Sequence, residues 1–250
     1  GINSQIYSRS GGFMGISFAI PIDEAMRVAD SLRANGRVIR GRIGVQIEPV
    51  TKEVAEAIGL GKPAGAQVRT IELNGPAEKA GFEPGDIITK VDGRAVERSG
   101  DLPRLIGAIK PGTKAVVQVF RRGSYRDLTV TVADFDAPMG GKAASEPTPA
   151  KPAPAASSAL GMSLSELTDA QRRELKIKGG VRGDEVAEGQ IAAKAGLRAG
   201  DVILTIDNNE VLSVKQFEGL IGKLDRSRPV SVLVRRADWV SYFVMRLPKN

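Results

Sequence analysis

The chain has 250 residues, of which 42% are hydrophobic and 26% charged, and its formal net charge is +7. This composition is typical of a globular protein that is long enough to build two small cores. Histidine and cysteine are absent, which excludes disulfides, thiolate chemistry and a Ser-His-Asp triad made by this chain alone.

The positive charge does not indicate a nucleic-acid partner. The 36 Lys and Arg residues are dispersed among 29 acidic residues, and only 4% of the chain is aromatic, so no stacking platform accompanies the charge. No apolar run approaches the roughly 18 residues that a membrane helix needs, so we expect no membrane insertion. We also expect no cofactor and no metal site. Because the chain begins with Gly1 rather than Met, we expect it to be a fragment of a longer protein.

The N-terminal residues predict two short strands followed by a helix. The segments 1–7 and 14–20 are joined by turn-forming residues, and Asp23 is a good N-cap for a helix that Gly36 closes. Two strands alone do not form a stable domain. The helix is either a leader packed on the first domain or a connector from a missing domain that contained the strands.

A ten-residue stretch occurs twice, at 79–88 and, 115 positions further on, at 194–203. Each copy reads as a short helix that stops at Ala-Gly, a tight turn closed by Gly-Asp, and an apolar strand. The match extends over roughly 90 to 100 residues, which is the size of a small domain. We therefore expect two homologous domains, at 37–135 and 159–250, after an N-terminal segment 1–22 and a connector helix 23–36.

The elements expected in the first repeat alternate between strands and helices. They are an extended segment 38–50, a helix 51–58, strands 65–73 and 86–91, a helix 101–109 capped by Asp101, and a hairpin over 114–133. The second repeat adds two capping boxes, Thr168 with Gln171 and Ser213 with Gln216, and a closing hairpin over 230–247. Together they predict a mostly β fold of the α+β class, each domain being a small twisted partial barrel with two helices.

The segment between the repeats has a different composition. Residues 136–158 contain five prolines and seven alanines, so there is almost nothing to bury and we expect a disordered or extended linker. Its r.m.s. reach is roughly 25 Å. The two domains are therefore expected to move independently.

A glycine between two apolar residues precedes a strand in both repeats, at 43–45 and 160–162. Such a glycine lets successive backbone N–H groups converge into an anion-binding concavity, where the terminal carboxylate of a peptide fits while the peptide backbone adds to the strand. An apolar helix stripe would form the opposite wall; alternatively, its residues belong only to the core. The candidate residues of the first groove are Arg42, Ile43, Gly44, Val45, Ile47, Leu102, Leu105 and Ile106. Those of the second are Leu160, Gly161, Met162, Leu164, Phe217, Leu220 and Ile221.

The apolar-Gly-apolar loop, the run 76–81, the Gly-Asp-Ile-Ile run 85–88 and the late apolar helix together resemble a bacterial, circularly permuted PDZ domain. The second repeat is similar, with Ile191 where the first has Pro76. The resemblance implies that both repeats grip the C-terminal residues of other polypeptides. Pro103 inside the first groove helix departs from the pattern, which leaves the ligand preference of that domain open.

Essentially the whole chain is similar to the C-terminal part of HtrA-family serine endoproteases of the DegP and MucD type. The resemblance rests on the segments 1–4 and 15–21, followed by a helix and the two repeats. It implies a periplasmic, trimer-based protease and chaperone whose nucleophile lies upstream of Gly1, so this chain would contain no catalytic residue. Residues 1–22 would be a remnant of a trypsin-like β-barrel. Ser4, Gln5 and Ile6 would pair with substrate backbone, and Ile6 and Ile16 would line a specificity pocket for small aliphatic residues.

Three functional hypotheses follow. The first is a substrate-recognition part, in which the first domain captures apolar C-termini or extended segments of misfolded proteins and the second supports assembly or a second grip. The alternative is a non-catalytic PDZ scaffold or adaptor. A self-contained enzyme with a Ser-Lys dyad is a third reading, for which no domain remains to hold the dyad.

Overall fold

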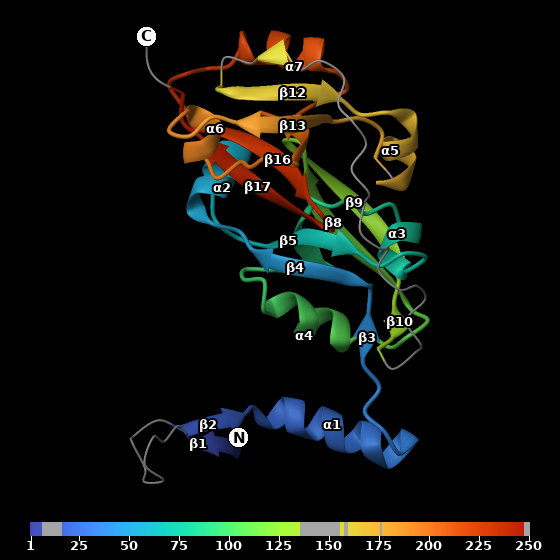
Figure 1. Cartoon of the computed structure of the whole chain (residues 1–250). Coiled ribbons are helices and arrows are strands. Elements are labelled where there is room, and N and C mark those ends of the chain that lie inside the picture. The colour runs from blue at the N-terminus through green and yellow to red at the C-terminus, as the bar shows by residue number, and fades with distance from the viewer. Residues whose placement is uncertain (7–16, 136–155, 158–159, 176, 248–250) are drawn as a thin grey trace.

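The computed structural model describes residues 1–6, 17–135, 156–157, 160–175 and 177–247. They form a small N-terminal unit and two open, mostly antiparallel sheets, each covered by short helices (Figure 1). Neither sheet closes into a barrel. In the described part of the chain, no helix is both long and apolar enough to cross a bilayer.

The N-terminal unit stands apart from both sheets in Figure 1. Strand β1 (Ile2–Ile6) pairs antiparallel with β2 (Ser17–Ile20), and α1 (Ile22–Asn35) follows. The helix ends at Gly36, whose φ of 67° allows the left-handed closing turn. Its N-cap is Pro21 without a side-chain hydrogen bond, so the prediction that Asp23 caps the helix was wrong: Asp23 lies inside the first turn. Several apolar side chains of α1 are exposed, namely Ile22, Met26 and Leu32.

The first sheet has the strand order β4-β5-β6-β8-β9, with β7 paired to β6 and a small β3–β10 ladder beside it. Its elements are β3 (Gly41–Arg42), β4 (Val45–Pro49), α2 (Lys52–Ile58), β5 (Ala66–Ile71), α3 (Pro76–Lys79), β6 (Ile87–Val91), β7 (Arg94–Ala95), α4 (Asp101–Gly107), β8 (Lys114–Arg121), β9 (Ser124–Thr131) and β10 (Ala133–Asp134). The cap of α4 is Gly100, not Asp101 as the sequence predicted. Asp101 instead accepts a hydrogen bond from the Arg98 N–H at 2.9 Å, which is the main reason that its pKa is lowered.

The second sheet repeats this plan with the order β11-β12-β13-β14-β16-β17, and β15 pairs with β14. Its elements are β11 (Ala156–Ser157), β12 (Met162–Glu166), α5 (Asp169–Glu174), β13 (Val181–Val186), α6 (Ile191–Lys194), β14 (Val202–Ile206), β15 (Asn209–Glu210), α7 (Val214–Ile221), β16 (Val230–Arg236) and β17 (Trp239–Met245). The capping box of Thr168 with Gln171 is confirmed. At α7 only half of the box forms, because the Gln216 side chain accepts from Leu212 N–H instead of from Ser213 N–H.

The repeated Gly-Asp turn is held in both domains by an ion pair. Asp86 is 1% exposed, and Arg121 at the end of β8 donates to its two oxygens at 2.6 and 2.7 Å. In the second domain Arg236 pairs with the fully buried Asp201, with both bonds at 2.8 Å. Burial acts to lower the pKa of Arg121, but the hydrogen bond and charge of Asp86 together with the charge of Glu83 outweigh it, so the pKa is raised and the guanidinium stays charged. The pair ties the turn to the neighbouring strand, because Ile87, which follows Asp86, is paired with Phe120, which precedes Arg121.

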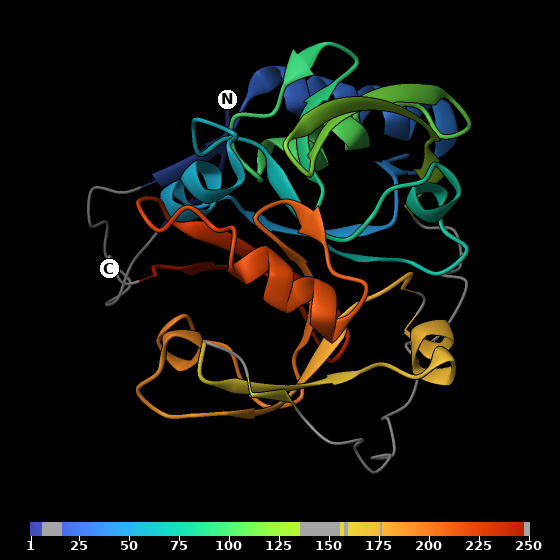
Figure 2. The same ribbon diagram turned by 90° about the horizontal axis from the view of Figure 1, so that it is seen from above.

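The two domains share an apolar cluster, contrary to the expected independent motion. Tyr242 and Val244 of β17 pack on a buried group from the first domain: Val50, Val54, Ala55, Ile58, Ile87 and Phe120. Figure 2 shows the red strands of the second domain lying against α2. The prediction of independent motion was based on the composition of the linker. That composition carries no information on whether the surfaces of the two domains bind each other. The apolar run of β17 is the sequence signal for this contact. Phe243 and Met245 pack on the core of their own domain, so the apolar residues that alternate with them need a second partner surface.

Polar contacts complete this interface. Ser241 donates to the Glu48 carboxylate at 2.5 Å, and the Gln67 side-chain amide donates to the same oxygen at 2.6 Å. Asn208 donates to the Ile58 carbonyl at 3.0 Å. Around them, Arg122 pairs with Glu210 and the Arg69 guanidinium lies over the Trp239 ring. The interface therefore combines buried apolar area with directional bonds that set one orientation of the domains.

The interface gives a prediction for alkaline pH. Burial raises the pKa of Tyr242 far above its ordinary value, and nearby Asp86 adds to the shift. Because the protonated phenol is the form that the docked state favours, docking should be at full strength below pH of about 10 and weaken as the pH rises above it. In an ultraviolet titration, one of the three tyrosines should ionise later than the others, and Tyr242→Phe should remove that late step. Simultaneous ionisation of all three would contradict the burial of Tyr242.

Candidate functional site

The candidate groove of the first domain lies between β4 and α4. Strand β4 is the outer strand of its sheet, and on the side away from β5 no described strand pairs with it. Figure 1 shows α4 along this free side. An outer strand presents unpaired backbone N–H and C=O groups, which can accept another extended chain.

The loop at the start of β4 has the geometry expected for an anion site. The carbonyl groups of Ile43 and Gly44 accept hydrogen bonds from the N–H groups of Ala77 and Glu72, each at 2.9 Å. In a trans peptide unit the following N–H points the opposite way from the carbonyl, so the N–H groups of Gly44 and Val45 are turned away from these partners. Among the described residues, the N–H groups of Ile43 and Gly44 have no hydrogen-bond acceptor.

Arg42 lies directly before this loop and is held by two partners. Its guanidinium pairs with Glu72 at 2.7 Å and donates to the Asp134 carbonyl at 3.1 Å, and both charged side chains are 15% exposed. Glu72 therefore neutralises the Arg42 charge and holds this side chain beside the loop. A cavity of about 560 Å³ adjoins the pair and includes Lys79 among its lining residues. Sequence reasoning missed Glu72 and Lys79, for which spacing offered no signal.

The apolar residues of this groove divide into two sets. Leu102 and Ile106 are each 3% exposed and belong to the core, as the alternative interpretation of the helix stripe had it. Val45, Ile47 and Leu105 are half-buried at the edge of the same core. Ile109, just beyond α4, is half-buried as well and was not among the predicted residues. The half-buried residues are those that remain available to a ligand side chain.

The candidate groove of the second domain is closed. The predicted residues Leu160, Met162, Leu164, Phe217 and Ile221 are all buried, and Leu220 is half-buried. The loop repeats the first one: Gly161 has a φ of 76°, and the carbonyls of Leu160 and Gly161 accept from Ala192 and Ala187. However, β12 is paired with β11 on its outer side. The two grooves therefore share a design but differ in access.

The remaining predicted residues lie far from both grooves in the chain. Ser4, Gln5 and Ile6 belong to β1, where Gln5 is opposite Phe18. Ile16 falls outside the described residues. Their predicted contact with substrate stays a prediction.

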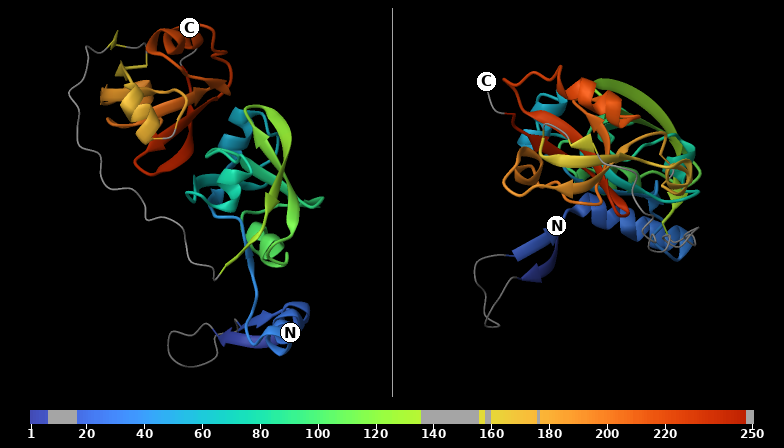
Figure 3. Two further views of the ribbon diagram at one scale, coloured as in Figure 1. Left: turned by 90° about the vertical axis from the view of Figure 1, so that its right-hand side faces the viewer. Right: turned by 45° about the horizontal axis from the view of Figure 1, so that its top comes forward.

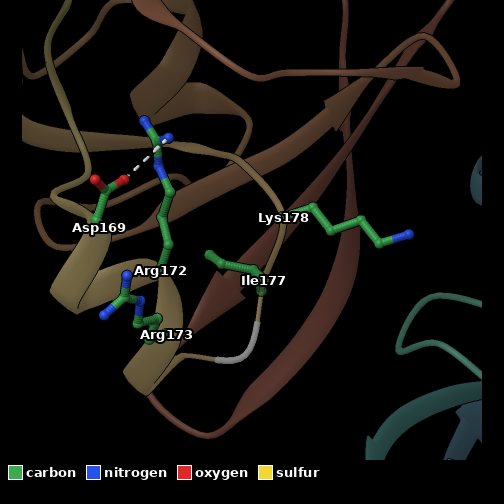
Figure 4. Close-up of a pocket in the computed structure, with 5 residues that line it drawn as sticks. All are labelled: Asp169, Arg172, Arg173, Ile177 and Lys178. Atoms are coloured by element: carbon green, nitrogen blue, oxygen red, sulfur yellow. Dashed lines mark ion pairs between the residues drawn. The ribbon is translucent and has the colours of Figure 1, made fainter.

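A second surface hollow, of about 540 Å³, lies beside α5 and is lined by Asp169, Arg172, Arg173, Ile177 and Lys178. Figure 4 shows these side chains spread around an open depression. Arg172 already pairs with Asp169 and Glu166, so we assign no ligand to this hollow. The described residues contain no group of three His, Cys, Asp or Glu side chains that could hold a metal ion.

Profiles of the PDZ domain family match residues 41–132 and 184–236. Both sheets, each with its glycine loop and late helix, are therefore PDZ domains. Over 99% of its length the chain is 47% identical to a "Probable periplasmic serine endoprotease DegP-like" of Pseudomonas fulva, and it is 44% identical to the protein of the same name in Halomonas elongata. It covers 51% of each, so the chain spans about half the length of these curated relatives.

Among solved structures, "HtrA-type protease AlgW with tripeptide" matches with a TM-score of 0.50 and 39% identity, covering 57% of this chain and 47% of that one. The chain belongs to the HtrA family and corresponds to the C-terminal, PDZ-containing part of its DegP-like members. The predicted family and fold class are confirmed. The predicted periplasmic location is confirmed by the names of the relatives.

Proposed function

We propose that this chain is the substrate-recognition part of a DegP-like serine endoprotease and chaperone, and that its first PDZ domain captures apolar C-termini or extended segments of misfolded proteins. The observation that carries the proposal is the free outer strand β4, which starts at a loop whose amides have no acceptor among the described residues. We assign cleavage to residues outside this chain, because a chain without histidine cannot complete a Ser-His-Asp triad.

The ligand adds to β4 as an antiparallel strand, with its C-terminal carboxylate at the N–H groups of the loop formed by Ile43, Gly44 and Val45. Charge-assisted bonds from backbone amides to a carboxylate are among the stronger hydrogen bonds in proteins. The half-buried Ile47, Leu105 and Ile109 contact the last side chains of the ligand, which favours apolar residues there. The main-chain ladder supplies affinity and the apolar wall supplies selectivity.

The relatives support this reading over the alternative of a non-catalytic scaffold. They are named as serine endoproteases, and the AlgW structure is described as holding a tripeptide. We further propose that the parent protein is a trimer-based oligomer and that Ser4, Gln5, Ile6 and Ile16 lie beside its catalytic centre, with small aliphatic residues at the cleaved position. A parent enzyme that strongly preferred Arg or Lys there would contradict the pocket assignment.

The proposal predicts that Gly44→Val weakens peptide binding by about 10- to 100-fold, the value of one charge-assisted hydrogen bond. Gly44 has a φ of +77°, which a β-branched residue adopts only with strain, and a Cβ there would lie 2.7 Å from the Glu72 carboxylate, which must move from its place beside Arg42. The measurement is a calorimetric titration of the whole chain with a peptide that ends in an apolar residue and a free carboxylate.

Gly93→Val is the matched control. Gly93 also has a φ of +77°, but no atom lies within 4 Å of its Cβ position, so the variant carries the same backbone strain away from the groove. It should keep the binding of the original chain. The peptide with an amidated C-terminus should bind the original chain as weakly as the free peptide binds Gly44→Val. Equal affinity of the original chain and Gly44→Val for the free peptide would refute the proposal.

A further inference from the structure

The second PDZ domain has an extra strand that the first lacks. Residues 156–157, at the end of the Ala/Pro-rich segment, form β11 and pair antiparallel with β12. Ala156 lies opposite Leu164 and Ser157 opposite Ser163. In Figures 1 and 3, β11 lies on the same side of β12 as α7. This is the position that a ligand strand takes in the groove proposed for the first domain.

The first domain provides an internal comparison. The offset of 117 that relates the two glycine loops places residues 39–40 where the second repeat has β11. There the Arg40 carbonyl accepts from the Phe135 N–H at 2.8 Å, and β3 pairs with β10. The chain before the first loop is thus led away from β4, whereas the chain before the second loop folds back on β12.

We propose that β11 is an internal ligand that closes the second groove. The inference rests on the proposed peptide-binding mode of the PDZ groove and assigns a regulation to the second copy. Strand β11 runs antiparallel to β12, and its C-terminal residue, Ser157, is the one nearer to the Leu160-Gly161 loop. Its polarity is therefore that of a bound C-terminal peptide, except that the chain continues into the loop instead of ending in a carboxylate.

The closure is local and reversible. Only residues 158–161 separate β11 from β12, so the loop-closure entropy is small, and the effective concentration of a segment tethered this closely is on the order of millimolar. A strand of two residues makes few ladder bonds, each worth little net free energy. Closure should therefore weaken the binding of an external peptide to the second groove by about tenfold. Tension that draws the linker away from β12 should open the groove.

The test uses Ala156→Pro with Ser157→Pro, which removes both N–H donors of β11. Ala143→Pro with Ala144→Pro is the control, because it adds the same two prolines further upstream in the linker. In hydrogen exchange of the whole chain, the β12 amides that face β11 should exchange about tenfold faster in the first variant only. The β12 amides that face β13 should not change. Unchanged exchange in both variants would overturn the closure.

Peptide binding then tests the role of the closure. In the Gly44→Val background, which disables the first groove, the Ala156→Pro/Ser157→Pro variant should bind an apolar C-terminal peptide about tenfold more tightly than the upstream double-proline control. Faster exchange without any gain in binding would overturn the role of β11 as an internal ligand. A first domain that binds no peptide would refute the proposed function, and the exchange result would still decide whether β11 covers β12.

Discussion

Replacing Arg121 by Met is expected to destabilise the first domain by about 3–5 kcal/mol, because it leaves Asp86 as a buried carboxylate without a counter-charge. Asp86 is 1% exposed and takes both of its charged contacts from this guanidinium. The same guanidinium also donates to the Gly81 carbonyl at 2.8 Å. Burial already raises the pKa of Asp86 in the presence of Arg121, so removal of the partner should drive protonation of the carboxyl or local unfolding.

Two further variants test whether the lost stability comes from the unpaired buried charge. The double variant Arg121→Met/Asp86→Leu removes both charges and should recover a large part of the lost stability, since apolar pairs often replace buried ion pairs at little cost. Arg236→Met in the second domain should cost less, because the Arg236 side chain is 23% exposed and that of Arg121 is 9%. Urea unfolding followed by circular dichroism measures all three. A loss below about 1 kcal/mol for Arg121→Met, the value of an exposed pair, would contradict the burial argument.

Gly41→Ala is expected to cost about 1–3 kcal/mol through overpacking and to weaken peptide binding. A Cβ at this position would lie 2.5 Å from the Ile106 carbonyl and 2.7 Å from that of Ile109. Both carbonyls belong to backbone that cannot rotate away, so the C-terminal end of α4 must shift. Because α4 is the wall of the proposed groove, the shift should appear in the peptide titration as well as in the unfolding curve.

The control lies on the same helix. No atom lies within 4 Å of the Cβ position of Gly107, and this residue is helical, so Gly107→Ala should be neutral or stabilising by up to about 1 kcal/mol. It should also leave peptide binding unchanged. If Gly41→Ala and Gly107→Ala behaved alike in both measurements, the close packing of β3 against α4 would not position the groove.

Local patterns predicted much of the fold. The repeated Gly-Asp turn requires left-handed backbone at Gly85 and Gly200, and both have it. Thr168 with Gln171 formed its capping box, because both partners lie within one turn of the helix. Asp23 and Asp101 failed as caps because an acceptor side chain is only one way to start a helix. The residues before them, Pro21 and Gly100, took the cap position without a side-chain bond.

The candidate groove residues were found in part. The glycine loops could be recognised because the same apolar-Gly-apolar triplet occurs at the start of a strand in both repeats. Glu72, which holds Arg42 behind the first loop, is 30 positions from its partner, and no periodicity connects them. The division of the helix stripe into buried Leu102 and half-buried Leu105 depends on how far the helix is rotated against the sheet, which is a property of the packed domain.

The amino-acid sequence by itself determined two copies of one PDZ fold and their family, because glycine positions, apolar periodicity and caps act over a few residues. Only the tertiary structure decided that the domains dock through Tyr242 and Val244, that no described strand pairs with the outer edge of β4 and that β11 pairs with the outer edge of β12. These outcomes depend on which surfaces meet. The docking of the domains buries apolar area between segments that are far apart in the sequence. The pairing of β11 with β12 joins a linker segment to a strand edge, and the local sequence patterns of both would also allow them to stay separate.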